Sequence, residues 1–382
     1  MIVNLFRKAW IFINIKKNWK KPKKAKILIY DHHLVFYFEK YIKEKNYQIY
    51  YNRFDSTSEV NLFIILKCLI NFDIKFKKYK KFYFYYVDPK IVITMDDNNP
   101  GFFKLKKEFP NLITIAIQKA WKYDTEIDII YQRHKKKENL DYSCDYLFCY
   151  NKYVGELFMK FIKIKKIYTI GSFMSNSQKI SNIKKNYIIY ISQWRNYEKS
   201  AIYHKDLTFG DWQKNEEIFL KKLSFFIREN SYNFKVLGKL AGNSSKYEKI
   251  FYDKIFGSNY EFIFQNDSRD RYKILDHAKL TVSLESTLGY ENLARGNKTI
   301  FFSIRSIPKL DFDCIRFCWP EHKGEKGPNW TNLISYSEFK RLFSLIDLSE
   351  DNWKEILKIN FKDTIQFDTN NSKLINLLNK FK

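Results

Sequence analysis

The sequence LTVSLESTLGYENLARGNKTI, residues 280–300, decides the fold. Its apolar run over residues 280–284 predicts a buried strand, which ends at Glu285. A helical pattern of apolar residues follows and stops at Gly296, and residues 299–302 predict the next strand. The stretch therefore predicts a compact β-α-β unit, the building block of a parallel sheet.

The junction between this strand and this helix offers groups that bind anions. Ser286 and Thr287 supply hydroxyls, and the first backbone N–H groups of the helix, at Leu288 and Gly289, lie at the positive end of the helix dipole. Such junctions bind phosphate or pyrophosphate. Glu291 follows within about one turn, where it would reach sugar hydroxyls beside that phosphate. The alternatives are that Ser286 or Thr287 only caps the helix and that Glu291 is a surface carboxylate.

Composition narrows the class of protein. The chain has 382 residues, of which 45% are apolar, so it can bury two cores and is not mainly disordered. Its net charge of +26 favours anionic partners such as nucleotides, nucleic acid or an anionic membrane. Five sparse cysteines without a CxxC pair argue against disulfides and zinc, and indicate a reducing, cytoplasmic compartment. No stretch reaches the roughly 18 uncharged apolar residues of a spanning helix.

The pattern of strands and helices divides the chain into five parts. Residues 1–25 form a basic arm, which is either an amphipathic helix on the anionic inner face of the plasma membrane or a solvated segment. Strands alternate with helices over residues 26–175 and again over 186–345, with a polar linker at 176–185 and a helical tail at 346–382. This rhythm predicts two Rossmann-like, doubly wound α/β domains whose strand ends face a cleft.

Several segments together resemble a known family. They are YDHH (30–33), KIVITMDDN (90–98), FPNLITIAIQ (109–118), YISQW (190–194), ESTLGYENLARGNK (285–298), WP (319–320) and KGPNWTN (326–332). In this order they resemble GT-B-type glycosyltransferases, and more narrowly a group of bacterial surface-carbohydrate biosynthesis proteins. One departure is that Lys119-Ala120 follow Gln118, where the family pattern continues with Asn-Gly.

The resemblance implies transfer of a sugar from a nucleotide-activated donor to a bacterial surface glycan. It implies that the C-terminal domain holds the nucleotide, that no catalytic metal or other cofactor is needed, and that the last helix crosses back to the first domain, with residues 353–359 as the candidate. Asp311-Phe312-Asp313 is formally a DxD motif, but we expect a loop without a metal role. A CMP-linked acidic sugar is the favoured donor, ahead of a UDP- or GDP-hexose.

Catalysis needs a base for the acceptor hydroxyl and groups that stabilise charge on the departing phosphate. Asp97 and Asp31, at predicted strand ends, are the candidate bases, and His32 and His33 are alternatives because histidine titrates in the useful range. Further candidates divide into cations for the phosphate (Lys239, Arg195), amides that orient a sugar (Asn98, Gln118) and rings that stack on a sugar or base (Trp319, Trp330). For the two tryptophans the alternative is a loop packed on the domain edge.

Three rival functions remain open on sequence grounds. The first is a CDP-alditol phosphotransferase of the teichoic-acid type, which keeps the fold and changes the reaction. The second is a basic nucleic-acid-binding protein, although the chain carries no recognisable DNA- or RNA-binding motif and we therefore expect no nucleic-acid partner. The third is a non-catalytic scaffold of a glycan-assembly complex, which Lys119-Ala120 makes plausible.

Overall fold

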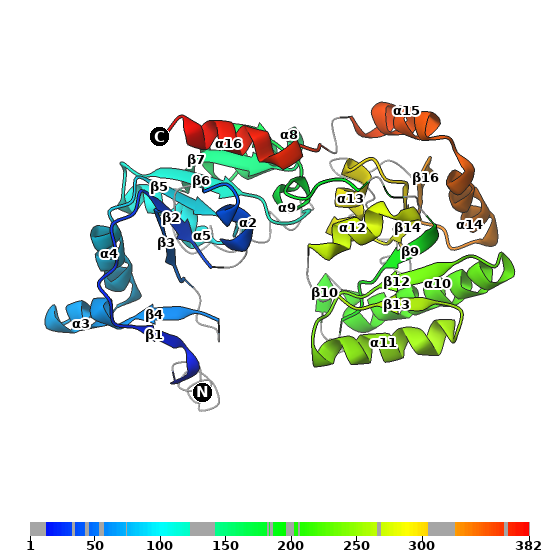
Figure 1. Cartoon of the computed structure of the whole chain (residues 1–382), viewed down its shortest axis with the longest axis horizontal. Helices are drawn as coiled ribbons and strands as arrows, with labels where there is room; N and C mark the ends of the chain where they lie inside the picture. The colour runs from blue at the N-terminus through cyan, green and yellow to red at the C-terminus, as the bar shows by residue number, and fades with distance from the viewer. Residues whose placement is uncertain are drawn as a thin grey trace. The chain divides into compact units, whose positions relative to one another are not determined.

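The computed structural model describes residues 13–32, 35–42, 46–52, 57–73, 75–122, 142–181, 183, 186–195, 202–204, 207–265, 269–304, 325–362 and 366–381. These residues form two compact units, each with its own parallel sheet (Figure 1). Unit 1 takes the described residues within 1–119, 126–169 and 372–382, and unit 2 takes those within 120–125 and 170–371. The predicted pair of doubly wound α/β domains is confirmed.

The sheet of unit 1 has six parallel strands in the order β3-β2-β5-β6-β7-β8. The strands are β2 (Ile27–Tyr30), β3 (Tyr47–Tyr50), β5 (Ile91–Thr94), β6 (Ile113–Ile117), β7 (Ser143–Cys149) and β8 (Lys163–Thr169). The helices are α2 (Val35–Glu39), α3 (Leu62–Ile70), α4 (Phe76–Val87), α5 (Pro100–Phe103), α6 (Leu105–Glu108), α8 (Lys152–Met159) and α16 (Ser372–Asn379). Because the chain runs from β2 first to β3 on one side and later to β5 on the other, the order reverses between β2 and β5. That is the topological switch point of unit 1.

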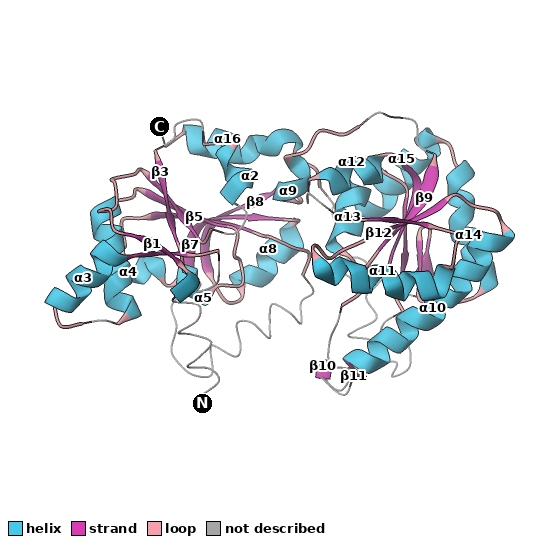
Figure 2. Cartoon of the chain, turned by 60° about the horizontal axis from the view of Figure 1, so that its bottom comes forward, coloured by secondary structure: helices cyan, strands magenta, loops and turns pink. Residues whose placement is uncertain are grey.

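The sheet of unit 2 has the order β13-β12-β9-β14-β15-β17-β16, parallel except for the last pair. Its strands are β9 (Tyr187–Ile191), β12 (Phe234–Leu237), β13 (Glu261–Ile263), β14 (Ala278–Ser283), β15 (Thr299–Phe302), β16 (Lys326–Gly327) and β17 (Trp330–Thr331). Its helices are α9 (Phe173–Asn176), α10 (Phe209–Glu229), α11 (Asn243–Phe256), α12 (Asp270–Asp276), α13 (Thr287–Ala294), α14 (Tyr336–Phe343), η2 (Ser344–Asp347), α15 (Glu350–Phe361) and η3 (Thr369–Asn371). Figure 2 shows α12 and α13 on one face of this sheet and α10 and α11 on the other. The strand order reverses between β9 and β14.

Continuous apolar runs explain the two sheets. The central strands, such as Ile91–Thr94 and Tyr187–Ile191, are buried along their whole length, as expected for parallel strands covered by helices on both faces. A smaller pair outside the main sheets, β10 (Ile202–His204) and β11 (Leu207–Thr208), precedes α10. Among the described residues, no helix combines the length and the apolar composition needed to cross a membrane.

Three segments differ from the sequence prediction. Residues 16–18 of the basic arm form strand β1 (Lys16–Asn18), which pairs in parallel with β4 (Glu59–Asn61), whereas the sequence predicted either an amphipathic helix or a solvated segment; residues 1–12 lie outside the described part. The boundary between the units falls between Thr169 and Ile170, before the predicted linker. The predicted return of residues 353–359 is wrong, because Trp353 is fully buried in unit 2 and its Nε1–H donates to the Gly296 carbonyl at 2.9 Å. The helix that returns to unit 1 is α16.

Candidate functional site

The candidate donor site of unit 2 lies at the switch point between β9 and β14. Ligands of open α/β sheets bind beyond the carboxyl ends of the strands at such a point. The turn Glu285-Ser286-Thr287 follows β14 there, and all three residues are partly exposed. Ser286 has the extended backbone of an N-cap (φ −73°, ψ 134°), and its Oγ accepts a hydrogen bond from Leu288 N–H at 3.3 Å. The strand, turn and helix expected from the sequence are therefore in place, and Ser286 does cap α13.

The first turn of α13 is held close to the sheet. Gly289 N–H donates to the Ser286 carbonyl at 2.8 Å, so this N–H and that of Leu288 both have partners within the turn. A Cβ at Gly289 would lie 2.5 Å from Ser283 Oγ and 3.1 Å from the Phe301 ring. Glycine is thus required for the close approach of the helix to β14 and β15. The roles of Leu288 and Gly289 as phosphate donors stay predictions.

Trp121 is a residue of unit 2 that sequence reasoning missed. Its backbone N–H donates to Thr287 Oγ1 at 3.2 Å. Its ring stacks on Tyr290 with centroids 4.1 Å apart and planes 8° apart, and Tyr290 stacks in turn on Phe301 at 4.9 Å. Trp121 therefore fixes the Thr287 hydroxyl and covers one side of α13. In the sequence Trp121 is notable only because it follows Lys119-Ala120, where the family pattern is broken. Nothing near it indicates a contact with Thr287, 166 positions later.

Glu291 is buried, with 1% of its surface exposed, so the reading as a surface carboxylate is wrong. One carboxylate oxygen accepts from Ser172 Oγ at 2.5 Å and the other from the Tyr272 hydroxyl at 3.0 Å. Ser172 is also the N-cap of α9, the first helix after the chain enters unit 2. In this conformation Glu291 ties α13 to α9 and α12. Its predicted contact with a donor ribose stays a prediction.

Arg295 and Asn297 of the most specific segment belong to a buried polar network. Arg295 and Asp276 form a fully buried ion pair, with Nε to Oδ1 at 2.9 Å and Nη2 to Oδ2 at 2.6 Å. Asp276 also accepts from the Asn297 side chain and from Ser181 N–H, both at 2.8 Å. The remaining guanidinium N–H groups donate to the backbone carbonyls of Ser175, Gln178 and Lys179. This hub joins α12 and the end of α13 to α9 and to the segment after α9.

The two predicted cations of unit 2 follow neighbouring strands. Arg195 follows β9 and is exposed, and Lys239 follows β12 and is partly exposed. Glu248, which is fully buried on α11, binds the backbone or side chains of residues that follow both strands. Its carboxylate accepts from the Ser192 hydroxyl, from Lys239 N–H at 2.8 Å and from Leu240 N–H at 2.9 Å. Arg195 and Lys239 thus lie just past two strand ends of one sheet, as the sequence predicted, and their role toward a phosphate stays a prediction.

The candidate base of unit 1 lies at the other switch point, after β2. Asp31 is 3% exposed, and its backbone has a φ of +92°, a left-handed conformation that costs a non-glycine residue free energy. His32 Nδ1 lies 3.3 Å from Asp31 Oδ1, and His32 Nε2 lies 2.8 Å from Thr57 Oγ1. The carboxylate and the imidazole therefore form a pair, held by a strained backbone. His33 lies outside the described residues.

Asp97, Asn98 and Gln118 follow the adjacent strands β5 and β6. Asp97 is 1% exposed and accepts from Lys119 N–H at 3.4 Å, whereas Asn98 is exposed. Gln118 is also 1% exposed, and its Oε1 accepts from Tyr150 N–H at 2.9 Å. Asp31 and Asp97 follow strand ends, as predicted, and the strand order makes these two strands neighbours. Gln118 joins β6 to β7, so its amide is engaged in the sheet rather than open.

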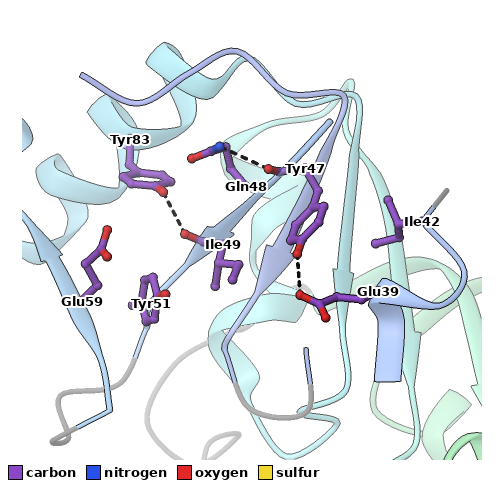
Figure 3. A pocket seen from close by; sticks show the side chains of 8 residues that line it. All are labelled: Glu39, Ile42, Tyr47, Gln48, Ile49, Tyr51, Glu59 and Tyr83. Atoms are coloured by element: carbon purple, nitrogen blue, oxygen red, sulfur yellow. Dashed lines mark hydrogen bonds between the residues drawn. The ribbon is translucent and has the colours of Figure 1, made fainter. Parts of the chain in front are cut away.

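A pocket of about 640 Å³ lies along the edge strand β3 of unit 1 (Figure 3). It is lined by Glu39, Ile42, Tyr47, Gln48, Ile49, Tyr51, Glu59 and Tyr83. Burial raises the pKa of the Tyr47 and Tyr51 hydroxyls, so both are neutral phenols at physiological pH. Tyr51 also contacts His32, with ring centroids 5.0 Å apart. The pocket, which sequence reasoning missed, therefore adjoins the Asp31–His32 pair.

Neither a stacking tryptophan nor a cluster of metal ligands is found among the described residues where the sequence offered candidates. Trp330 is 4% exposed in β17, and a Cβ at Gly327 would overlap its ring, so a sugar-stacking role does not fit its position. The alternative of a residue packed at the domain edge describes it. Trp319 and the 311–313 motif lie outside the described residues. Within the described part of the chain, no group of three or more His, Cys, Asp or Glu side chains is arranged to hold a metal ion.

Comparisons with known proteins identify the family. Over residues 115–382 the chain matches a family model described as "putative O-antigen biosynthesis protein". A variant of the wall teichoic acid polymerase TagF soaked with CDPG is similar at 13% identity and a TM-score of 0.53, over 100% of this chain and 98% of that chain. A Listeria monocytogenes structure described as "putative UDP-N-acetylglucosamine 2-epimerase" is similar at 11% identity and a TM-score of 0.54, over 94% of this chain and 96% of that chain. No curated protein matches the sequence.

The structural likenesses show the GT-B fold, and the family match covers well over half of the sequence. The chain therefore belongs to this family of O-antigen biosynthesis proteins.

Proposed function

We propose that this protein is a transferase of bacterial surface-glycan synthesis, which takes a nucleotide-activated donor in unit 2 and activates an acceptor hydroxyl in unit 1. The observation that carries the proposal is the topology. In each unit the leading candidates, Arg195 and Ser286 in unit 2 and Asp31 and Asp97 in unit 1, follow the two strands that flank the switch point, where open α/β sheets bind ligands. The family match and the GT-B fold support the same reading.

In unit 2 the donor phosphate would lie at the amino end of α13. Ser286 and Thr287 are partly exposed there, and Arg195 stands at the neighbouring strand end. Positive groups that are fixed before the reaction stabilise the charge that develops on the departing phosphate. The Thr287 hydroxyl is preorganised by Trp121 N–H, so little reorganisation is needed when the phosphate binds.

In unit 1 we favour the Asp31–His32 pair as the base. Asp31 holds Nδ1 of the imidazole and stabilises the imidazolium that forms when Nε2 takes the proton. The acceptor hydroxyl would replace the Thr57 hydroxyl, which is 2.8 Å from Nε2. The adjoining pocket offers tyrosine rings, two carboxylates and an amide, groups that suit the faces and hydroxyls of a sugar.

A thermal-shift screen against CMP, CDP, UDP and GDP tests the donor site. A ligand present at 100 times its Kd stabilises the native state by about 2.7 kcal/mol, which raises the Tm by several degrees. We expect the cytidine nucleotides to give the largest shift. Arg195→Gln should reduce the shift, whereas Arg228→Gln, which removes an exposed arginine of the same unit, should not. If no nucleotide at millimolar concentration moves the Tm, the donor-site proposal fails.

We favour a CMP-linked acidic sugar as donor, and a CDP-linked alditol is the second candidate because TagF soaked with CDPG shares the fold over nearly the full length of both chains. Release of CMP does not separate them. A CMP-sugar gives a glycosidic bond and CMP, while a CDP-alditol gives a phosphodiester and CMP. A donor labelled with ³²P next to the transferred group decides, since only phosphotransfer carries the label into the acceptor. His32→Gln should slow either reaction at saturating donor and leave the nucleotide shift intact.

A further inference from the structure

Exposed apolar side chains occur along α3, on the turn after it, at the start of α4 and just after strand β1. Along α3, Leu66 is 50% exposed, Leu69 47% and Ile70 60%. These positions are three and four residues apart and so share one face, while Ile64 and Cys68 are buried on the other. The segments lie together at the rim of unit 1 in both Figure 1 and Figure 2. Contiguous apolar patches with a polar rim mark protein or membrane contacts.

Phe72, at the tip of this surface, is the most informative residue. It is 98% exposed and has a φ of +52°. Phe72 N–H donates to the Leu69 carbonyl, and Asp73 N–H donates to the Cys68 carbonyl, which is the hydrogen-bonding pattern that ends a helix at a left-handed residue. Glycine usually occupies that position because a side chain there is strained. Phe72 therefore costs conformational free energy and recovers none by burial in the fold.

Neighbouring segments extend the apolar surface and give it charge. Trp19 is 72% exposed just after β1, and Phe76 is 47% exposed at the start of α4. Residues 13–24 and 59–88 together carry twelve lysines against three carboxylates, a net charge of +9. A third of the excess charge of the whole chain is thus concentrated in about a ninth of its length.

We propose that this surface, which we call the α3 face (Leu66, Leu69, Ile70, Phe72 and Trp19 with the surrounding lysines), docks the protein on an anionic lipid bilayer. Aromatic and aliphatic tips enter the interface, while lysines contact acidic headgroups. A second copy of the chain fits poorly, because it would bring one lysine-rich surface against another. A nucleic acid would use the lysines but not the aliphatic stripe. The inference does not depend on the donor or on the reaction.

Vesicle co-sedimentation tests the proposal with neutral vesicles of phosphatidylcholine and with vesicles containing 30% phosphatidylglycerol. The wild-type protein should bind the anionic vesicles, and binding should weaken as salt rises. Phe72→Gly is the decisive variant, since it removes the ring and relieves the backbone strain. Its affinity for anionic vesicles should fall by about tenfold, because a buried aromatic side chain contributes at least that factor, while its Tm should stay equal or rise.

Matched control variants distinguish binding through the α3 face from non-specific adsorption to vesicles. Ile359→Ser removes a 71% exposed side chain from α15 and should bind like the wild type. The triple variant Lys75→Gln/Lys77→Gln/Lys81→Gln should lose affinity for anionic vesicles, and Lys152→Gln/Lys160→Gln/Lys165→Gln should lose clearly less. Nucleotide thermal shifts should not change in any of these variants.

Three results would overturn the proposal. The first is a wild-type protein that stays in the supernatant with anionic vesicles at low salt. The second is a Phe72→Gly variant that binds as tightly as the wild type. The third is self-association that Phe72→Gly abolishes without any effect on vesicle binding, which would assign the surface to a protein contact.

Discussion

Removal of the Arg295 guanidinium should destabilise unit 2 severely. Arg295→Met keeps the approximate length of the side chain but leaves the Asp276 carboxylate buried with only the Asn297 and Ser181 donors. Breaking a buried ion pair in this way costs about 3–5 kcal/mol. Three backbone carbonyls also lose a donor, at about 1 kcal/mol each or more. The total of about 5 kcal/mol or more is a large part of the 5–15 kcal/mol that stabilises a typical domain.

A double-mutant cycle makes this prediction quantitative. Asp276→Asn alone should also be costly, because it leaves the guanidinium buried without a counter-charge, whereas Arg295→Met/Asp276→Asn removes both charges and should cost at least 2 kcal/mol less than the sum of the single variants. Urea unfolding followed by circular dichroism measures all four proteins. Arg341→Met is the control, since this arginine pairs with Glu338 at a partly exposed site. If the cost of the double variant equals the sum of the two single-variant costs within about 0.5 kcal/mol, Arg295 and Asp276 are not coupled and the prediction is refuted. The guanidinium is fully buried, so nucleotide binding by the folded Arg295→Met protein should persist.

Three further predictions concern packing, thiols and pH. Gly289→Ala places a Cβ 2.5 Å from Ser283 Oγ, so the Tm should fall by an amount equivalent to about 1–3 kcal/mol and the nucleotide shift should shrink; unchanged values would contradict the close packing. Burial raises the pKa of two thiols to about 12 and that of a third above its usual value, so native alkylation at pH 8, mapped by mass spectrometry, should spare Cys144, Cys149 and Cys68. Hydrogen bonds from Arg341 lower the pKa of Glu338, so the charged Glu338 stabilises the fold above the ordinary glutamate pKa of about 4.3, and this stabilisation is lost as the pH falls through the lowered pKa. The Tm advantage of the wild type over Glu338→Gln should therefore vanish in acid, and an advantage that persists there would refute the assignment.

The fold was readable from the sequence where the signal is local. Apolar runs such as residues 91–94 and 187–191 predicted central strands, and Gly296 predicted the end of α13, because each of these features depends on neighbouring residues alone. The positions of Asp31 and Asp97 at strand ends could be predicted in the same way, from the apolar runs that precede them. Helix α4, with its alternating lysines and aromatics, gave no clear periodicity, although its Tyr83 and Phe84 are buried.

What the sequence did not reveal depends on distant partners. Glu291 looks like a surface residue until Ser172, 119 positions earlier, is placed beside it. Strand β1 exists because Lys16–Asn18 pairs with residues 59–61, and nothing near residue 16 signals that partner. The same holds for Trp121 on Tyr290 and for the pocket along β3. Long-range contacts of this kind are set by topology, which periodicity does not encode.

The return of α16 to unit 1 has a consequence for biosynthesis. Leu374 and Leu377 of this helix are buried in unit 1, and Phe381 contacts Tyr146 of β7. The unit that leaves the ribosome first thus waits for residues 372–381 before its last hydrophobic seam closes, while every segment of unit 2 has already emerged. A released chain truncated after residue 371 should therefore hold a folded unit 2 and a unit 1 that proteases still cut.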